Sequence, residues 1–114
     1  LAPYGLAAVE TLNNLGIYED VAKKIVMGEN IAQAYQFVAT HNAQLGFVAL
    51  SQVMKQGKLS SGSGWIVTKD LYSPIRQDAV LLKKAEHNDA AKALLDYLKS
   101  DKALAIIESY GYSH

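Results

Sequence analysis

The sequence contains no cysteine and no excess of charge of either sign. Its 114 residues include 11 lysines and arginines against 11 aspartates and glutamates. Without cysteine, disulfide scaffolds, thiolate metal sites and cysteine nucleophiles are excluded. A nucleic-acid-binding protein usually carries a basic excess, and an electrostatic membrane anchor needs a basic surface. Zero net charge favours neither, so no nucleic-acid partner is expected.

Long hydrophobic runs are also missing. The longest apolar stretch, residues 45–50, is far too short to cross a bilayer. Half of the chain is nevertheless hydrophobic and 19% is charged, which indicates a folded domain rather than a disordered linker. The first residue is Leu1 rather than Met, and no signal peptide is visible. We therefore expect a processed or truncated piece of a longer protein.

Helical periodicity is present in several parts of the sequence. After Pro3, apolar side chains recur three residues apart, and Asn30 precedes a second amphipathic stretch as a favourable N-cap. Near the C-terminus, Ser100 or Asp101 caps a helix that Gly111 ends. The predicted helices cover residues 4–15, 18–24, 30–40, 51–56, 88–98 and 100–110.

Short apolar runs between these helices predict β-strands. The run at residues 45–50 is nearly continuous, which is typical of a strand buried on both faces of a parallel sheet. The other predicted strands cover residues 25–27, 65–68 and 75–85. Because strands and helices alternate, the sequence predicts an α/β fold with a mixed or largely parallel sheet.

The patterns that mark catalytic or metal chemistry are not found. His41, His87 and His114 do not pair at ligand spacing, so solvated surface histidines are expected instead of a metal site. The Ser-Gly segment at residues 60–64 matches neither the nucleophile elbow nor the phosphate loop, and it indicates a flexible surface loop. These residues therefore give no support to a catalytic or metal site.

The two helix starts at Pro3-Tyr4-Gly5 and at residues 28–31 offer free backbone N–H groups. Such ends, with the helix dipole behind them, bind anions without any lysine or arginine. Ordinary capping is the alternative, because every helix has such an end. Tyr4 does not fit the apolar stripe of its helix, so its hydroxyl is free to face a ligand.

Five segments in order along the chain carry a resemblance to a known family. They are residues 1–8 (LAPYGLAA), 28–33 (GENIAQ), 44–51 (QLGFVALS), 72–80 (YSPIRQDAV) and 106–112 (IIESYGY). Together they resemble the second half of the periplasmic molybdate-binding proteins, which are the substrate-binding components of molybdate ABC importers. The resemblance covers essentially the whole chain.

The resemblance implies a two-lobed periplasmic binding protein of type II, of which this chain is about half. Residues 1–74 would be an α/β segment of the second lobe. Residues 75–114 would be the crossover strand and the C-terminal helices that pack on the first lobe. The missing N-terminal half of the same protein is then a partner, because it carries the hydroxyl groups on the other side of the ligand.

The resemblance also implies a binding protein that is not an enzyme and needs no cofactor. It implies the ligand and the residues that bind it as well. Molybdate, and with it the similarly sized tungstate, would lie between the lobes and pass to an ABC permease. Tyr4 would donate its backbone N–H and its hydroxyl, and Ile31 its backbone N–H. Some members use a tyrosine where this chain has Ala49, and Tyr4 is expected to replace it. The resemblance implies that the protein lies in the periplasm. In a cell with a single membrane it would be lipid-anchored on the extracytoplasmic side.

A second function remains open at this point. The same fold serves as the effector-sensing domain of transcriptional regulators, where it is joined to a DNA-binding helix-turn-helix. The sequence that precedes residue 1 in the parent protein distinguishes the two, because a signal peptide supports the importer and a helix-turn-helix supports the regulator.

Overall fold

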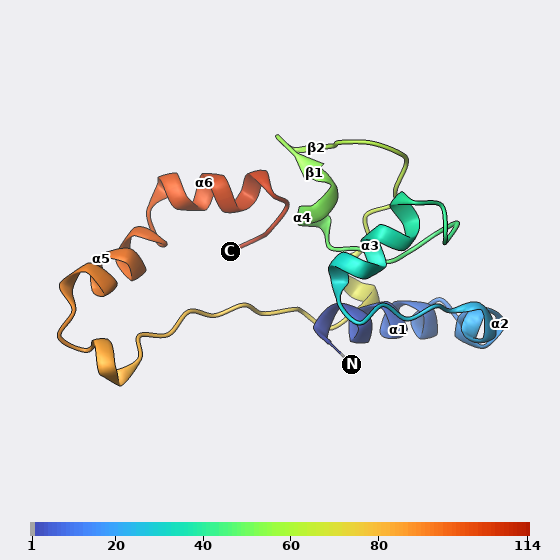
Figure 1. The fold of residues 1–114 in the computed structure, drawn as a ribbon, viewed down its shortest axis with the longest axis horizontal. Helices are drawn as coiled ribbons and strands as arrows, with labels where there is room; N and C mark the ends of the chain where they lie inside the picture. Colours follow the sequence, from blue (N-terminus) through green and yellow to red (C-terminus); the bar gives the residue numbers. More distant parts are fainter. Residues whose placement is uncertain (1) are drawn as a thin grey trace.

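Helices joined by long irregular segments make up the chain in the computed structural model, which describes residues 2–114 (Figure 1). The α-helices are α1 (Pro3–Asn14), α2 (Tyr18–Val21), α3 (Ile31–Ala39), α4 (Leu50–Val53), α5 (Asp89–Tyr97) and α6 (Asp101–Ser109). The 3-10 helices are η1 (Ala22–Lys24), η2 (Lys69–Leu71) and η3 (Lys83–Ala85), and the strands are β1 (Met54–Lys55) and β2 (Lys58–Leu59).

The helix ends follow the local sequence signals. The side chains of Asn30, Asn88 and Ser100 accept hydrogen bonds from backbone N–H groups in the first turns of α3, α5 and α6. Gly16 and Gly111 have φ angles of 70° and 85°, the left-handed conformation that ends a helix at little cost for glycine. These helices were predicted because capping and periodicity are properties of the segment itself.

The predicted strands are not paired. Residues 25–27, 46–49, 65–68 and 75–82 belong to no ladder, and the one sheet in the described part of the chain is the antiparallel hairpin of β1 and β2. That hairpin replaces the second half of the helix predicted at 51–56. A strand needs a neighbour for its backbone N–H and C=O groups, and residues 2–114 do not supply one to these segments.

The molecule is consequently open. The right-hand part of Figure 1 holds α1 to α4 and the hairpin, and an extended segment after η2 leads to α5 and α6 on the left. The radius of gyration is 17.3 Å, against about 13 Å for a compact domain of this length. The accessible surface is 9274 Å², against about 6,100 Å² for a compact monomer of this mass. The fold therefore leaves much of its apolar surface uncovered.

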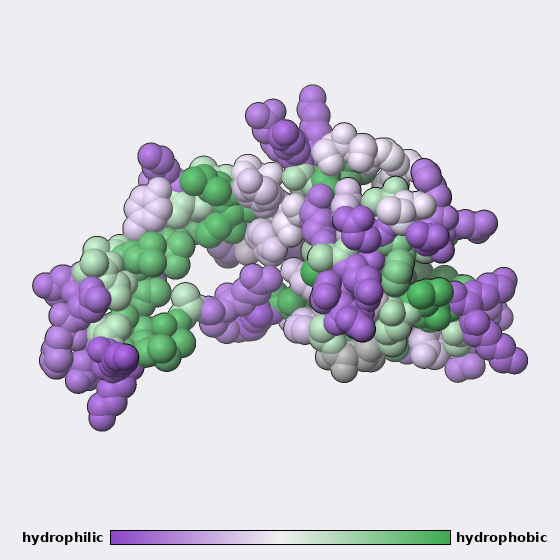
Figure 2. Space-filling model, viewed as in Figure 1, coloured by the Kyte–Doolittle hydropathy of each residue, from purple (hydrophilic) through white to green (hydrophobic). Residues whose placement is uncertain are grey.

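The side chains that should form the core are largely exposed. Ala49 and Ala103 are the buried hydrophobic residues among those described. Apolar atoms gather over α5 and α6 in Figure 2, where Leu94 is 59% exposed. Tyr97 in α5 and Tyr110 at the C-cap of α6 are exposed as well. Residues 2–114 therefore cover the apolar sides of these helices only in part.

Helix α1 holds the start of the extended segment. One carboxylate oxygen of Glu10 accepts the backbone N–H of Ser73 at 2.6 Å, and the other accepts the Ser73 hydroxyl at 3.2 Å. The side-chain amide of Asn14 donates to the carbonyl of Leu71 at 2.9 Å. These contacts fix the point from which the chain leaves the right-hand part of the structure.

Candidate functional site

The first turn of α1 presents unpaired backbone donors. Ala2 occupies the N-cap and its side chain caps nothing, while Pro3 has no N–H. The first helical hydrogen bond runs from the N–H of Leu6 to the carbonyl of Ala2 at 3.0 Å. The N–H groups of Tyr4 and Gly5 therefore have no protein acceptor among residues 2–114.

The first turn of α3 is capped, but only in part. The side chain of Asn30 accepts the N–H of Gln33 at 3.0 Å, and the side chain of Gln33 accepts the N–H of Glu29 at 2.6 Å. This reciprocal pair satisfies two backbone donors. The N–H groups of Ile31 and Ala32 are left without an acceptor in the described chain.

Helix α4 contacts the start of α3 and the C-terminal tail. Gln52 donates from Nε2 to the carbonyl of Ile31 at 3.2 Å, and its Oε1 accepts the N–H of Ala49 at 3.0 Å. The neighbouring Ser51 accepts the hydroxyl of Tyr112 at 3.0 Å. These side chains, with Tyr4 and its partner Gln77, are called the polar cluster.

The hydroxyl of Tyr4 is already engaged within the chain. It accepts the side-chain amide of Gln77 at 3.4 Å. The hydrogen bond to Tyr112 raises the pKa of Tyr4, with a smaller contribution from partial burial, because the neutral phenol is the form that donates. The Ser51 hydroxyl, and to a smaller extent the contact with Tyr4, lower the pKa of Tyr112. The free donor that Tyr4 offers is its backbone N–H.

The side chains of this cluster are tyrosine, serine and glutamine, so the site carries no formal charge. Within residues 2–114, no group of three or more histidine, cysteine, aspartate or glutamate side chains is placed to hold a metal ion. The site can therefore donate hydrogen bonds from neutral groups and from two helix N-termini.

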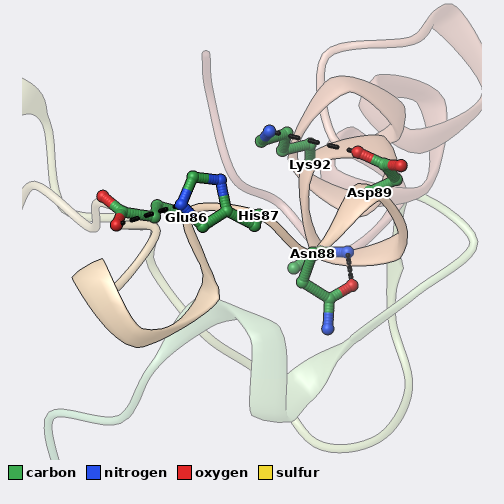
Figure 3. Close-up of polar contacts among 6 residues, drawn as sticks. Glu86, His87, Asn88, Asp89 and Lys92 are labelled. Carbon is green, nitrogen blue, oxygen red and sulfur yellow. Dashed lines mark hydrogen bonds and ion pairs between the residues drawn. The ribbon is translucent and has the colours of Figure 1, made fainter.

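The histidines lie on the surface, as predicted. His87 is 92% exposed and lies 3.4 Å from Glu86 (Figure 3). In the same view, Asn88 caps α5 and Lys92 pairs with Asp89 at 4.0 Å. His41 is exposed, and His114 lies 3.5 Å from Glu108. These contacts are ordinary surface capping and ion pairing.

A hollow opens beside the cluster. It has a volume of about 400 Å³ and is lined by the extended segment, α6 and the C-terminal tail: Ile75, Gln77, Ile107, Tyr112, Ser113 and His114. Gln77 and Tyr112 belong to both the hollow and the polar cluster.

Among residues 2–114, none of the helices has the length and the hydrophobicity that a membrane span requires.

Comparison with known proteins identifies the family. Residues 1–113 match the sequence model of the family described as "Bacterial extracellular solute-binding protein". The chain belongs to the bacterial extracellular solute-binding proteins. Members of this family bind solutes and are not enzymes, in agreement with the sequence prediction.

Individual relatives share this similarity along the whole chain. "Molybdate-binding protein ModA" of Azotobacter vinelandii is 63% identical over 111 residues, which cover 97% of this chain and 44% of the relative. The protein of the same name from Rhodobacter capsulatus is 56% identical over 112 residues, or 97% of this chain and 43% of that protein. This solute-binding protein chain spans less than half the length of these relatives.

A solved structure confirms the fold class. The Azotobacter vinelandii periplasmic molybdate-binding protein superposes with a TM-score of 0.87 at 36% identity, covering 98% of this chain and 49% of the other. The predicted α/β fold of periplasmic binding proteins is therefore correct, although the strands of this chain lack their partners.

Sequence reasoning missed the residues that connect the site. Gln52 lies 21 residues from Ile31, and Tyr112 lies 61 residues from Ser51. Periodicity and capping do not extend across such separations. Gln77 and Tyr112 stand inside two of the segments that carry the family resemblance, and this was the one signal available for them.

Replacing Gln52 tests its bridging role. The change Gln52→Leu keeps the size of the side chain but removes both hydrogen bonds, so we expect a loss of about 1–3 kcal/mol of stability. Urea unfolding of the full-length protein measures it. The control is Gln36→Leu in α3, because the exposed Gln36 side chain makes no hydrogen bond in the described structure. Equal stability of the two variants would contradict the bridge.

Proposed function

We propose that the full-length protein binds molybdate, and also tungstate, between two lobes and delivers it to an ABC permease. The observation that carries this proposal is the 63% identity to a molybdate-binding protein along nearly the whole chain. The two helix starts also support it, because they have unpaired N–H groups at the positions where the resemblance predicts ligand contacts.

The proposed ligand contacts are backbone donors. The N–H groups of Tyr4 and Ile31 would each donate to an oxygen of the oxyanion, with the positive end of a helix dipole behind each. Neutral donors suit a dianion such as molybdate. A phosphate that carries a proton would need an acceptor, which backbone N–H groups do not provide. Sulfate is smaller and would leave some donors unpaired.

Residues 1–74 are proposed to form the α/β segment of the second lobe. Residues 75–114 would be the crossover segment and the C-terminal helices that pack on the first lobe. Leu45, Val80 and Leu94 are largely exposed, so apolar side chains in both parts are available to pack on the rest of the protein. The missing N-terminal half is the proposed partner of these side chains.

An extracytoplasmic location follows from the same family membership. We propose the periplasm, or the outer face of the membrane for a lipid-anchored form in a single-membrane cell. No cofactor is required for this activity, because the oxyanion is the transported ligand. The partner is the permease of the importer, which would receive the closed, loaded protein.

Calorimetric titration of the full-length protein tests this proposal. We expect tight binding of molybdate and tungstate, and sulfate binding weaker by at least about 100-fold, since each unpaired buried donor costs about 1–3 kcal/mol. Heat from sulfate equal to that from molybdate would overturn the selectivity. No binding of either metal oxyanion would overturn the function and favour effector sensing in a regulator.

A further inference from the structure

The side-chain amide of Gln52 links two helices through both of its ends. Its Oε1 accepts the N–H of Ala49 at the start of α4, and its Nε2 donates to the carbonyl of Ile31 in the first turn of α3. Exchanging the two ends of the amide would set an oxygen against a carbonyl and an NH2 against an N–H, so these partners fix its orientation. Gln52 lies 21 residues beyond Ile31, and the link therefore depends on the fold.

The Ala49 end of this link is firmly placed. Ala49 is one of the two buried hydrophobic residues among those described, with 4% of its surface exposed. The segment that leads to it packs on α3, because a Cβ at Gly46 would overlap Cγ2 of Val38. Gln52 itself is partly buried, so water competes less for its hydrogen bonds. The amide thus connects the start of α3 to a fixed point.

The cap of α3 does not give the same support. The hydrogen bonds among Glu29, Asn30 and Gln33 join residues that are close in sequence. Such a cap sets the geometry inside the first turn, but it moves together with the turn. The hydrogen bond from Gln52 reaches the turn from another element, so it sets where the turn lies relative to α4.

The carbonyl that Gln52 contacts belongs to the residue that carries a proposed ligand donor. Ile31 is the first residue of α3, and its N–H has no acceptor in the described chain. In a helical residue the backbone dihedral angles are fixed, so the direction of the carbonyl also determines the direction of the N–H. A hydrogen bond that holds the carbonyl of Ile31 therefore holds its N–H as well.

We infer that Gln52 is a positioning residue of the oxyanion site and that it acts through the carbonyl of Ile31. This inference rests on the proposed function. Gln52 contributes by keeping the N–H of Ile31 in place, without contacting the anion. A rigid tetrahedral anion binds most tightly to donors whose positions are already set, because binding then does not have to order them.

A double-mutant cycle in the full-length protein tests this inference, with molybdate affinity measured by calorimetry at a temperature where all variants are folded. Gln52→Leu is expected to weaken binding by about five- to tenfold. Gln52→Met, which is unbranched and keeps the length of the side chain, should show the same loss and replaces the leucine variant if that variant folds poorly.

The second arm of the cycle uses two variants of Ile31. Ile31→Pro lacks the N–H that Gln52 positions, and proline is tolerated at the first position of a helix. Adding Gln52→Leu to it should therefore cause a much smaller further loss of affinity. Ile31→Ala keeps the N–H, so the full effect of Gln52→Leu should remain in that background.

Asn88→Ala is the control for a purely structural role. It removes the side chain that accepts the N–H of Ala91 at 3.1 Å and caps α5, so it should lower the melting temperature, as Gln52→Leu does. Its molybdate affinity should nevertheless equal that of the wild type. If Gln52 only stabilised the fold, its variants would also lose melting temperature without losing affinity.

Two results would overturn the inference while the wild type binds molybdate. One is unchanged affinity in Gln52→Leu and Gln52→Met, and the other is an undiminished effect of Gln52→Leu in the Ile31→Pro background. Absence of molybdate binding by the wild type is a different result, because it would overturn the proposed function and the inference together.

Discussion

Residues 1–114 expressed on their own are expected to bind no molybdate that calorimetry can detect, and to bind a hydrophobic dye such as ANS strongly. The full-length protein should show the opposite behaviour in both measurements. Two properties of the structure lead to this expectation, namely the uncovered apolar surface and the incomplete set of ligand donors.

The uncovered surface is large. The accessible area of 9274 Å² exceeds that of a compact monomer of this mass by about 3,000 Å². Leu45 is 90% exposed and Val80 is 80% exposed, while only two alanines of the described residues are buried hydrophobic side chains. Burial at this level does not offset the conformational entropy of ordering the chain, so a loosely packed state is expected.

The second property is that residues 2–114 hold only part of the proposed set of ligand donors. The unpaired N–H groups of Tyr4 and Ile31 lie on one side of the proposed ligand, and the resemblance places further hydroxyl groups on the missing half. With one side open, water competes for the anion and the field of the helix dipoles is screened. Sharp cooperative unfolding of the isolated chain together with molybdate binding would show that this reasoning is wrong.

Prediction from sequence succeeded where the information is local. The start of α3 follows from Asn30, and the end of α6 follows from Gly111, because a cap is satisfied within a few residues. The run at 45–50 carries an equally clear pattern for a buried strand. Its pairing depends on a neighbouring strand, and residues 2–114 supply none, so the segment stays unpaired.

The candidate site shows the same division. Tyr4 and Ile31 could be proposed from the sequence because each stands at a helix start, which is a local feature. Gln52 and Tyr112 could not, because a glutamine in a short helix and a tyrosine in a tail have no periodicity that marks them. Only the fold shows that Gln52 contacts Ile31 and that Tyr112 contacts Ser51.

Replacing Ile31 with proline is expected to weaken molybdate binding by the full-length protein by about 10- to 100-fold, the loss of one hydrogen bond to a charged ligand. Ile31 is the first residue of α3, where proline is tolerated because that N–H makes no helical bond. The preceding Asn30 is already extended, with φ of −153° and ψ of 171°, as a residue before proline must be. The substitution therefore removes the donor and leaves the helix intact.

Two matched variants separate the loss of the N–H from other effects. Ile31→Ala removes the half-buried side chain but keeps the donor, so it should retain most of the affinity. Asp101→Pro introduces proline at the same position of α6, a helix of the same nine-residue length, where the preceding Ser100 is likewise extended. It should leave affinity unchanged. If Ile31→Pro folded and bound molybdate as tightly as Ile31→Ala, the backbone N–H of Ile31 would not be a ligand contact, and the oxyanion site would have to be sought away from the start of α3.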